Sequence, residues 1–439
     1  MKTRLWLIAG LILLTINLRA AITGTTPLIG NVQEALTLSD TQVSVLATLP
    51  VLCLGVFAWL APRLARRLGT HAAVCAAVGV LALGTVVRAV PWPTALFAGT
   101  VLSGAGIAVG NVLLPAVIKD HFAQRIGLFT GLAMTLMAVS GAFAAAVAVP
   151  LCTAAGWQPA LAVWAVPAAL AAAVWWLLAA PGARGRHRGS QPPAAPRTTG
   201  GSGGSLLRCA LAWWVSAFLG LVSLMFYVLV AWLPQIMHAS GYTRGQAGLM
   251  MSVMLAIGIP LGFVVPVVAA RMRSQRLLVV AVIVAKLISL AGLLLAPAFG
   301  WVWVCLLGAA TGGAFPLAIT LLGLRTDGPR AAADLSGMAQ TIGYLLAGLG
   351  PLAIGVLHNA TDGWRVPLTV LIALVVPEAI AGLLAARPGH VRPSRREDDP
   401  APQTVPYKYK QSGCRTSTVG PVTSRTGTSD GWRGAFRPP

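Results

Sequence analysis

The chain has 439 residues, of which 56% are apolar and only 10% are charged, and its mean hydropathy is +0.78. Soluble proteins average about 25% charged residues, so this composition excludes a soluble globular protein and indicates a polytopic membrane protein. The net charge of +21 would suit a nucleic-acid partner, but the basic residues occur in short clusters between apolar runs. We therefore expect a lipid bilayer, and no nucleic acid, around this chain.

Twelve apolar stretches follow one another along the sequence, each of roughly 18 to 25 residues, enough for a helix to cross ~30 Å of hydrocarbon. Because the bilayer core offers no water to backbone amides, each stretch must be helical, and the period-2 pattern of a barrel is absent. The sequence thus predicts an all-α fold. The expected spans are 5–29, 41–61, 71–90, 94–118, 126–150, 159–180, 208–236, 246–268, 277–296, 300–323, 335–357 and 364–386.

Lys and Arg are unevenly distributed among the connecting loops. The amino terminus and alternate loops hold 17 of them, whereas the opposite loops hold Arg244 and Arg365, with Arg88 at a helix end. Loops rich in positive charge stay inside, so both termini are expected on the cytoplasmic side of the cell membrane. A basic start before an apolar run also fits a signal peptide, but Arg19 interrupts the run and no clean small-x-small cleavage site follows.

Two stretches depart from the helical pattern. Residues 181–206 are rich in Pro, Gly and Arg and separate six spans from six, which predicts a flexible cytoplasmic linker between bundles at 1–180 and 207–386. Residues 387–439 hold ten basic and four acidic residues with almost no apolar periodicity, which predicts a disordered basic tail. This tail is either a dispensable extension or a segment that binds anionic lipid.

The two six-span halves resemble each other when the first is shifted by 201 residues. The residues that then fall on an identical residue are Pro115, Gly127, Met137, Ala138, Pro150 and Leu151. Their common register argues for a duplicated six-helix unit. Since both halves start inside, the repeat is parallel, as in two bundles that rock about a central site.

Four segments carry a family resemblance. They are NLRAAITGTTPLI, GAGIAVGNVLLPAVIK, SLMFYVLVAWLPQI and LSGMAQTIGYLLAGLGPLAIGVLH, in spans 1, 4, 7 and 11. Together they resemble the cyanate and nitroimidazole transporter branch of the major facilitator superfamily, over residues 1–386. The resemblance implies a twelve-helix secondary transporter working by alternating access, with spans 1, 4, 7 and 10 lining a central cavity and spans 3, 6, 9 and 12 at the periphery. The loop after span 2 reads LAPRLARRLG, without the acidic residue of the family's usual Gly-x-x-x-Asp-Arg, which puts charge-relay gating at this loop in doubt.

Arg19 is the most hydrophilic residue of span 1, roughly 21 Å along the helix from Leu5 at 1.5 Å per residue. Its side chain points back toward the membrane centre, where facing lipid would cost at least about 2.5 to 3.5 kcal/mol, so it should face a wet cavity. The first six spans hold no acidic residue away from their interfaces, which makes the cargo its candidate partner. Its planar fork suits a small anion or a polar group of similar geometry. Alternatively, carbonyls near Gly24 and Pro27 or a neighbouring helix hold it.

Further polar or aromatic residues of the spans are candidates for the same cavity. The predicted substrate-binding set comprises Arg19, Asn17, Asn111, Ser223, Tyr227, Trp232, Gln340 and Tyr344. Ser223 and Tyr227 share a helix face, whereas Asn17 and Arg19 do not. Polar residues of this kind also join neighbouring helices, so each has a packing role as its alternative.

Catalysis finds little support in the sequence. The six cysteines form no CxxC pair, the histidines lie near helix ends, in loops or in the tail, and no paired carboxylates project into the membrane. We expect no catalytic residue, metal or cofactor, and a monomer whose partner is a small-molecule substrate. The expected function is transport of a small anionic or polar solute such as cyanate. The alternative is an exporter of larger apolar or cationic compounds, including nitroimidazole-like ones.

Two further charges lie inside the membrane, Lys286 in span 9 and Glu378 in span 12. Counted from Arg276 and Arg387 at 1.5 Å per residue, both lie roughly 13 to 15 Å from the inner boundary. A pair largely cancels the penalty that each charge would carry alone. The sequence predicts a structural ion pair; the alternatives are a snorkelling Lys286 with a separate Glu378, and a coupling role for Glu378.

Overall fold

A computed structural model describes residues 2–180 and 206–391. The predicted linker lies outside these residues except for Leu206, and the predicted tail lies outside them except for residues 387–391. Within the described residues, twelve helical segments are long and apolar enough to cross a membrane. The all-α fold and the number of spans are therefore as the sequence predicts.

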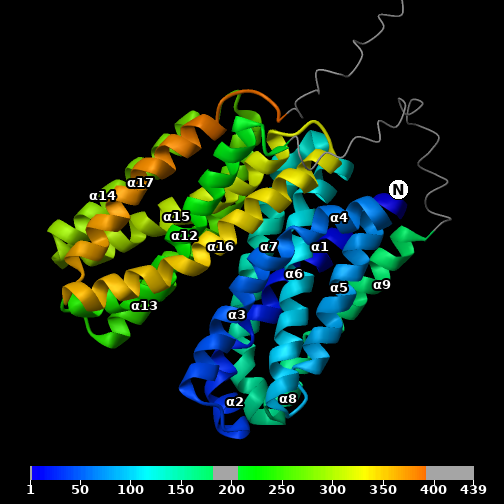
Figure 1. Cartoon of the computed structure of the whole chain (residues 1–439), viewed down its shortest axis with the longest axis horizontal. Coiled ribbons are helices and arrows are strands. Elements are labelled where there is room, and N and C mark those ends of the chain that lie inside the picture. Colours follow the sequence, from blue (N-terminus) through cyan, green and yellow to red (C-terminus); the bar gives the residue numbers. More distant parts are fainter. Residues whose placement is uncertain (1, 181–205, 392–439) are drawn as a thin grey trace, which may run out of the picture. The chain divides into compact units, whose positions relative to one another are not determined.

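The first six segments run from blue to green in Figure 1. They are α1 (Lys2–Thr23) with η1 (Thr26–Leu28) and α2 (Ile29–Leu36), α3 (Asp40–Ala58), α5 (Thr70–Val87), α6 (Pro93–His121), α7 (Ile126–Ala155), and α8 (Trp157–Ala162) with α9 (Ala165–Ala179). The short basic helix α4 (Leu60–Leu68) follows α3, and η2 (Ala123–Arg125) precedes α7.

The second six segments run from green to orange in Figure 1. They are α12 (Ala210–Ala239), α13 (Arg244–Arg271), α14 (Arg276–Leu295), α15 (Gly300–Leu324) after η3 (Pro297–Phe299), α16 (Pro329–Thr361) and α17 (Arg365–Ala385). Several of these helices are longer than the apolar stretch that predicts them, because a helix satisfies its own backbone and can continue past the hydrocarbon. Helix α16 spans 33 residues, against the 335–357 expected.

The packing of the helices confirms the duplication. In the first bundle α1 packs on α7, α5 on α9, α5 on α6 and α3 on α6; the equivalent pairs of the second bundle are α12 with α16, α14 with α17, α14 with α15 and α13 with α15. The starts of α3 and α13 also match, since Ser39 with Gln42 and Thr243 with Gln246 each form a capping box. Between the bundles, α3 packs on α16 and α7 on α13, a reciprocal arrangement expected of two related halves.

Lys286 and Glu378 meet inside the second bundle. Lys286 Nζ forms an ion pair with Glu378 Oε1, and both side chains are fully buried between α14 and α17. The second carboxylate oxygen, Oε2, has no hydrogen-bond partner. The predicted contact is therefore present, away from the bundle interface.

The ordered chain continues beyond the predicted start of the tail. Val391 is 2% exposed, and its backbone N–H donates to the Arg325 carbonyl at 2.7 Å. Arg325 is itself buried and donates from Nε to the Ala385 carbonyl at 2.9 Å. Buried contacts therefore extend through Val391, because one apolar side chain after the proline-glycine pair still packs against the bundle.

Candidate functional site

A small cavity lies where the two bundles face each other. Its volume is about 30 Å³, and it is lined by residues of α1, α3, α6 and α7 from the first bundle and of α15 and α16 from the second. The polar lining residues are Arg19, Asn111, Gln340 and Tyr344. The described lining contains no carboxylate, so the site has a net positive charge.

Arg19 is held in this cavity by close packing along its stem. A Cβ added to Gly141 of α7 would lie 2.8 Å from Arg19 Cγ, so glycine at 141 lets α7 approach the arginine stem. Thr23, one turn later, bonds across to the Gly141 carbonyl at 3.0 Å. The stem is thereby fixed between α1 and α7, and Arg19 as a whole is partly exposed.

Tyr227 of α12 is the protein partner of this guanidinium. The two side chains interact electrostatically, so the contact crosses from one bundle to the other. The ring of Tyr227 lies edge-on to that of Tyr344, with centroids 6.5 Å apart. A phenol oxygen leaves most of the five guanidinium donors free for another acceptor.

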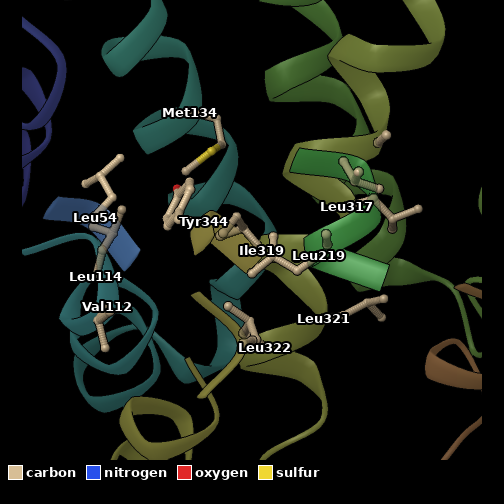
Figure 2. Packing of buried hydrophobic residues seen from close by; sticks show 14 of the residues in the cluster. Leu54, Val112, Leu114, Met134, Leu219, Leu317, Ile319, Leu321, Leu322 and Tyr344 are labelled. Atoms are coloured by element: carbon tan, nitrogen blue, oxygen red, sulfur yellow. The ribbon is translucent and has the colours of Figure 1, made fainter. Parts of the chain in front are cut away.

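Helix α16 supplies two residues one turn apart, Gln340 and Tyr344. Gln340 Nε2 donates to Ser336 Oγ at 2.8 Å and, across the bundle interface, to the Asn111 carbonyl at 3.3 Å. Figure 2 shows the ring of Tyr344 beside Leu54 and Met134, which also line the cavity. The site therefore combines one cation and two amides with an apolar and aromatic wall.

Four predicted residues do not line the cavity: Tyr227, described above, and three that pack elsewhere. Asn17 is two residues before Arg19, so it points about 200° away from it around the helix. It is buried against α9, where its Nδ2 donates to the Pro167 carbonyl at 3.0 Å. Trp232 Nε1 donates to the Pro351 carbonyl at 2.8 Å and joins α12 to α16. Ser223 is 1% exposed, and its hydroxyl has no partner. We withdraw these three as substrate ligands.

The cavity also contains residues that sequence reasoning missed. Met134 and Met137 of α7 and Phe315 of α15 line it, together with Leu18 and Ile319. An apolar side chain that faces a cavity has the same sequence signature as one that faces lipid. The sequence could have indicated these residues only through their position in spans 5 and 10. The family resemblance assigns span 10, but not span 5, to the cavity.

The bundles also meet at the end of the helices where α4 and the last turn of α6 lie, which we call the basic end after its Arg66, Arg67 and Lys119. There Arg66 of α4 forms a salt bridge with Asp334 of α16, and Lys119 Nζ donates to the Gly323 carbonyl at 3.2 Å. The loop after span 2 has no acidic residue of its own, and its Arg66 instead pairs with an acidic residue of the second bundle.

A histidine pair ties helices together at the basic end of the first bundle. His71 Nε2 lies 2.7 Å from His121 Nε2, and His71 Nδ1 lies 3.2 Å from the Leu178 carbonyl. With Asp120, these residues place three potential metal-ligand atoms within 4.8 Å of one another. The two imidazoles already bond to each other, and the contact joins α5, α6 and α9.

Comparisons with known proteins agree with this architecture. A family model described as the Major Facilitator Superfamily matches residues 8–351. The 2-nitroimidazole transporter of Escherichia coli (strain K12) is 36% identical over 393 residues, which cover 89% of this chain and 98% of the relative. The cyanate transport protein CynX of the same organism is 28% identical over 357 residues, 81% of this chain and 90% of the relative.

A solved structure supports the fold alone. The E. coli fucose:proton symporter FucP has a TM-score of 0.66 at 14% identity, and the match covers 87% of this chain and 99% of the symporter. The family model covers most of the chain, and the match to the nitroimidazole transporter spans 98% of that relative. The chain therefore belongs to the Major Facilitator Superfamily, in the group that includes the cyanate and nitroimidazole transporters, and is a multi-pass membrane transporter.

Proposed function

We propose that the chain is a secondary active transporter that carries a small anionic or polar solute, cyanate-like in size and shape, across the cell membrane. The observation that carries this proposal is Arg19, a cation in a cavity between the bundles whose described lining has no carboxylate to neutralise it. A charge at this depth is costly without a partner. An anionic cargo supplies the missing charge.

The donors around the cavity suit such a cargo. The guanidinium presents its N–H groups as a planar fork, which matches an anion that offers two acceptors or one end of a linear one. The side chain of Asn111 adds an amide donor, whereas both N–H groups of Gln340 already bond to Ser336 and to the Asn111 carbonyl. The volume of about 30 Å³ restricts a cargo bound in this conformation to a few atoms.

Alternating access follows from where the bundles touch. We place the basic end and both chain termini in the cytoplasm, because positively charged loops stay inside. In this conformation the salt bridge between Arg66 and Asp334 and the bond from Lys119 hold the cytoplasmic end closed. Opening requires these contacts to part while Arg19 exchanges its cargo. One chain supplies every part of this site, so a monomer suffices.

A second cargo class has its own support. The 36% identical relative is named a 2-nitroimidazole transporter, and a nitro group is planar with two oxygen acceptors, which the fork of Arg19 can also bind. The rings of Phe315 and Tyr344 offer a surface for an aromatic cargo. A larger cationic cargo lacks such support, because the described lining has no carboxylate.

Uptake of labelled cyanate into proteoliposomes tests the proposal, with 2-nitroimidazole as competitor. Arg19→Lys is expected to keep the fold and the charge but to lower uptake by about tenfold or more, since an ammonium cannot reproduce the fork. Arg67→Lys, at an exposed position of α4, is the matched control and should transport normally. Undiminished uptake by both Arg19→Lys and Arg19→Ala would refute a cargo-binding role.

A further inference from the structure

A second cavity lies inside the first bundle, toward the end opposite the basic end. It has a volume of about 40 Å³ and lies between α1, α3 and α6. Its polar lining comes from Arg88, Thr25, Thr26, Thr100 and Ser103. The residues that close it on the other sides are largely apolar, so this small chamber is built around one buried cation.

Arg88 reaches the chamber from the end of α5. A Cβ on Gly99 would lie 2.3 Å from the Arg88 backbone nitrogen, so the glycine lets α6 pass directly against the start of this side chain. The guanidinium Nη1 donates to the Ala21 carbonyl at 2.7 Å and to Thr25 Oγ1 at 3.0 Å, which aims the group at the end of α1. Arg88 is 3% exposed.

The rest of this guanidinium has no partner. Its Nε and Nη2 make no hydrogen bond, and neither does the buried hydroxyl of Ser103 in the same chamber. The salt bridges among the described side chains do not include Arg88. An arginine side chain keeps its charge in proteins, so the guanidinium of Arg88 is a buried cation.

A buried charge with unpaired donors is strongly unfavourable, and most such donors in proteins have a partner. The two free nitrogens belong to one edge of the planar group, which is the edge that binds anions in a fork. The hydroxyl of Ser103 can donate to the same acceptor. The chamber is therefore lined by three hydrogen-bond donors without an acceptor and by one positive charge without an acidic partner.

The size of the chamber limits what fills it. A cavity of about 40 Å³ holds two or three waters or one ion of about the size of chloride. Thr26 and Ala47 line the chamber and are exposed, so the chamber lies close to the protein surface. Ile22 lines both this chamber and the cavity that contains Arg19, so the two sites share one wall residue.

We propose that Arg88 and Ser103, with Thr25 orienting the guanidinium, form a second binding site, for a small inorganic monovalent anion between a halide and a linear triatomic ion in size. The site is separate from the one at Arg19 and binds anions whether or not the cargo of the transporter is an anion. The site lies beside Ile22, which also lines the cavity of Arg19. An anion bound there either sheds its hydration water on the way to Arg19 or stays bound and stabilises the first bundle.

The test uses the purified full chain with Arg19→Gln, which silences the central site. Thermal unfolding is measured with sodium chloride, bromide or cyanate against sodium gluconate at constant ionic strength. The small anions should raise the unfolding temperature in a saturable way, because they bind the folded state, whereas gluconate is too large. Adding Arg88→Gln should weaken this anion affinity by about tenfold or more.

Two further variants keep the result interpretable. Ser103→Ala removes a donor that has no partner in the protein, so it should preserve the fold and weaken anion affinity by about threefold, even if Arg88→Gln does not fold. Arg67→Gln is a matched loss of a surface arginine and should leave the affinity unchanged. Equal stability in chloride and gluconate would show that waters fill the chamber and would overturn the proposal. So would a shift that survives Arg88→Gln.

Discussion

The buried pair of Lys286 and Glu378 gives a sharp prediction about stability. Each side chain is fully buried, so removing one partner leaves the other charge without solvent or a counter-ion. Breaking a buried pair from one side costs about 3–5 kcal/mol, whereas replacing both groups by uncharged ones of similar shape is close to neutral. Lys286→Met and Glu378→Gln should each destabilise by about this amount, and the double variant should recover most of the loss.

The assay is a double-mutant cycle by thermal denaturation in one detergent at one scan rate, because unfolding of large proteins is often irreversible. Arg276→Gln, at the exposed start of the same helix, combined with Glu378→Gln provides a control pair whose effects should add. Simple addition of the two losses for Lys286→Met and Glu378→Gln would refute the reasoning, since it would mean that the charges do not interact. Transport by the double variant would further show that neither charge is needed for coupling.

Three other predictions follow from contacts described above. Asp334→Asn should weaken the contact between the bundles at the basic end by no more than about 1 kcal/mol, because its partner Arg66 is 44% exposed. Single cysteines introduced at the ends of α4 and α16 should then react faster with a maleimide. An unchanged labelling rate would exclude a gating role for this salt bridge. Trp232→Phe should lose one hydrogen bond, cost about 1 kcal/mol in stability and leave Km unchanged, whereas a raised Km would place it in the site. Truncation after Val391 should preserve the unfolding temperature, whereas truncation before Arg387 should lower it by removing a buried side chain; equal temperatures would show that this segment contributes nothing.

The spans and the duplication were predictable because they rest on properties of single residues and of their spacing. Hydrocarbon requires long apolar helices, and the shift of 201 residues aligns Pro115 in α6 with Pro316 in α15. The depth of Arg19 could also be counted along one helix. The contact of Lys286 with Glu378 followed from equal depth together with the arrangement that the family resemblance implies.

The remaining parts of the site depend on which helix faces which, and a single sequence does not encode that in a local pattern. Asn17 and Arg19 lie on one helix, yet one packs on α9 and the other faces the cavity. The partner of Arg66 is 268 residues away, on a helix of the other bundle. Arg88 reads as an interfacial charge in the sequence, and only its contacts with the end of α1 show that it is buried.

The lysine–glutamate pair also constrains how the chain is made. Lys286 is synthesised 92 residues before Glu378, so at about 5–20 residues per second it waits roughly 5–20 s for its partner. Throughout that interval its helix has entered, or waits beside, a membrane in which a central lysine costs about 2.5–3.5 kcal/mol. The ninth helix is therefore poorly held in lipid until the twelfth arrives. We therefore expect a chain that stops short of Glu378 to leave Lys286 without the partner that offsets its burial.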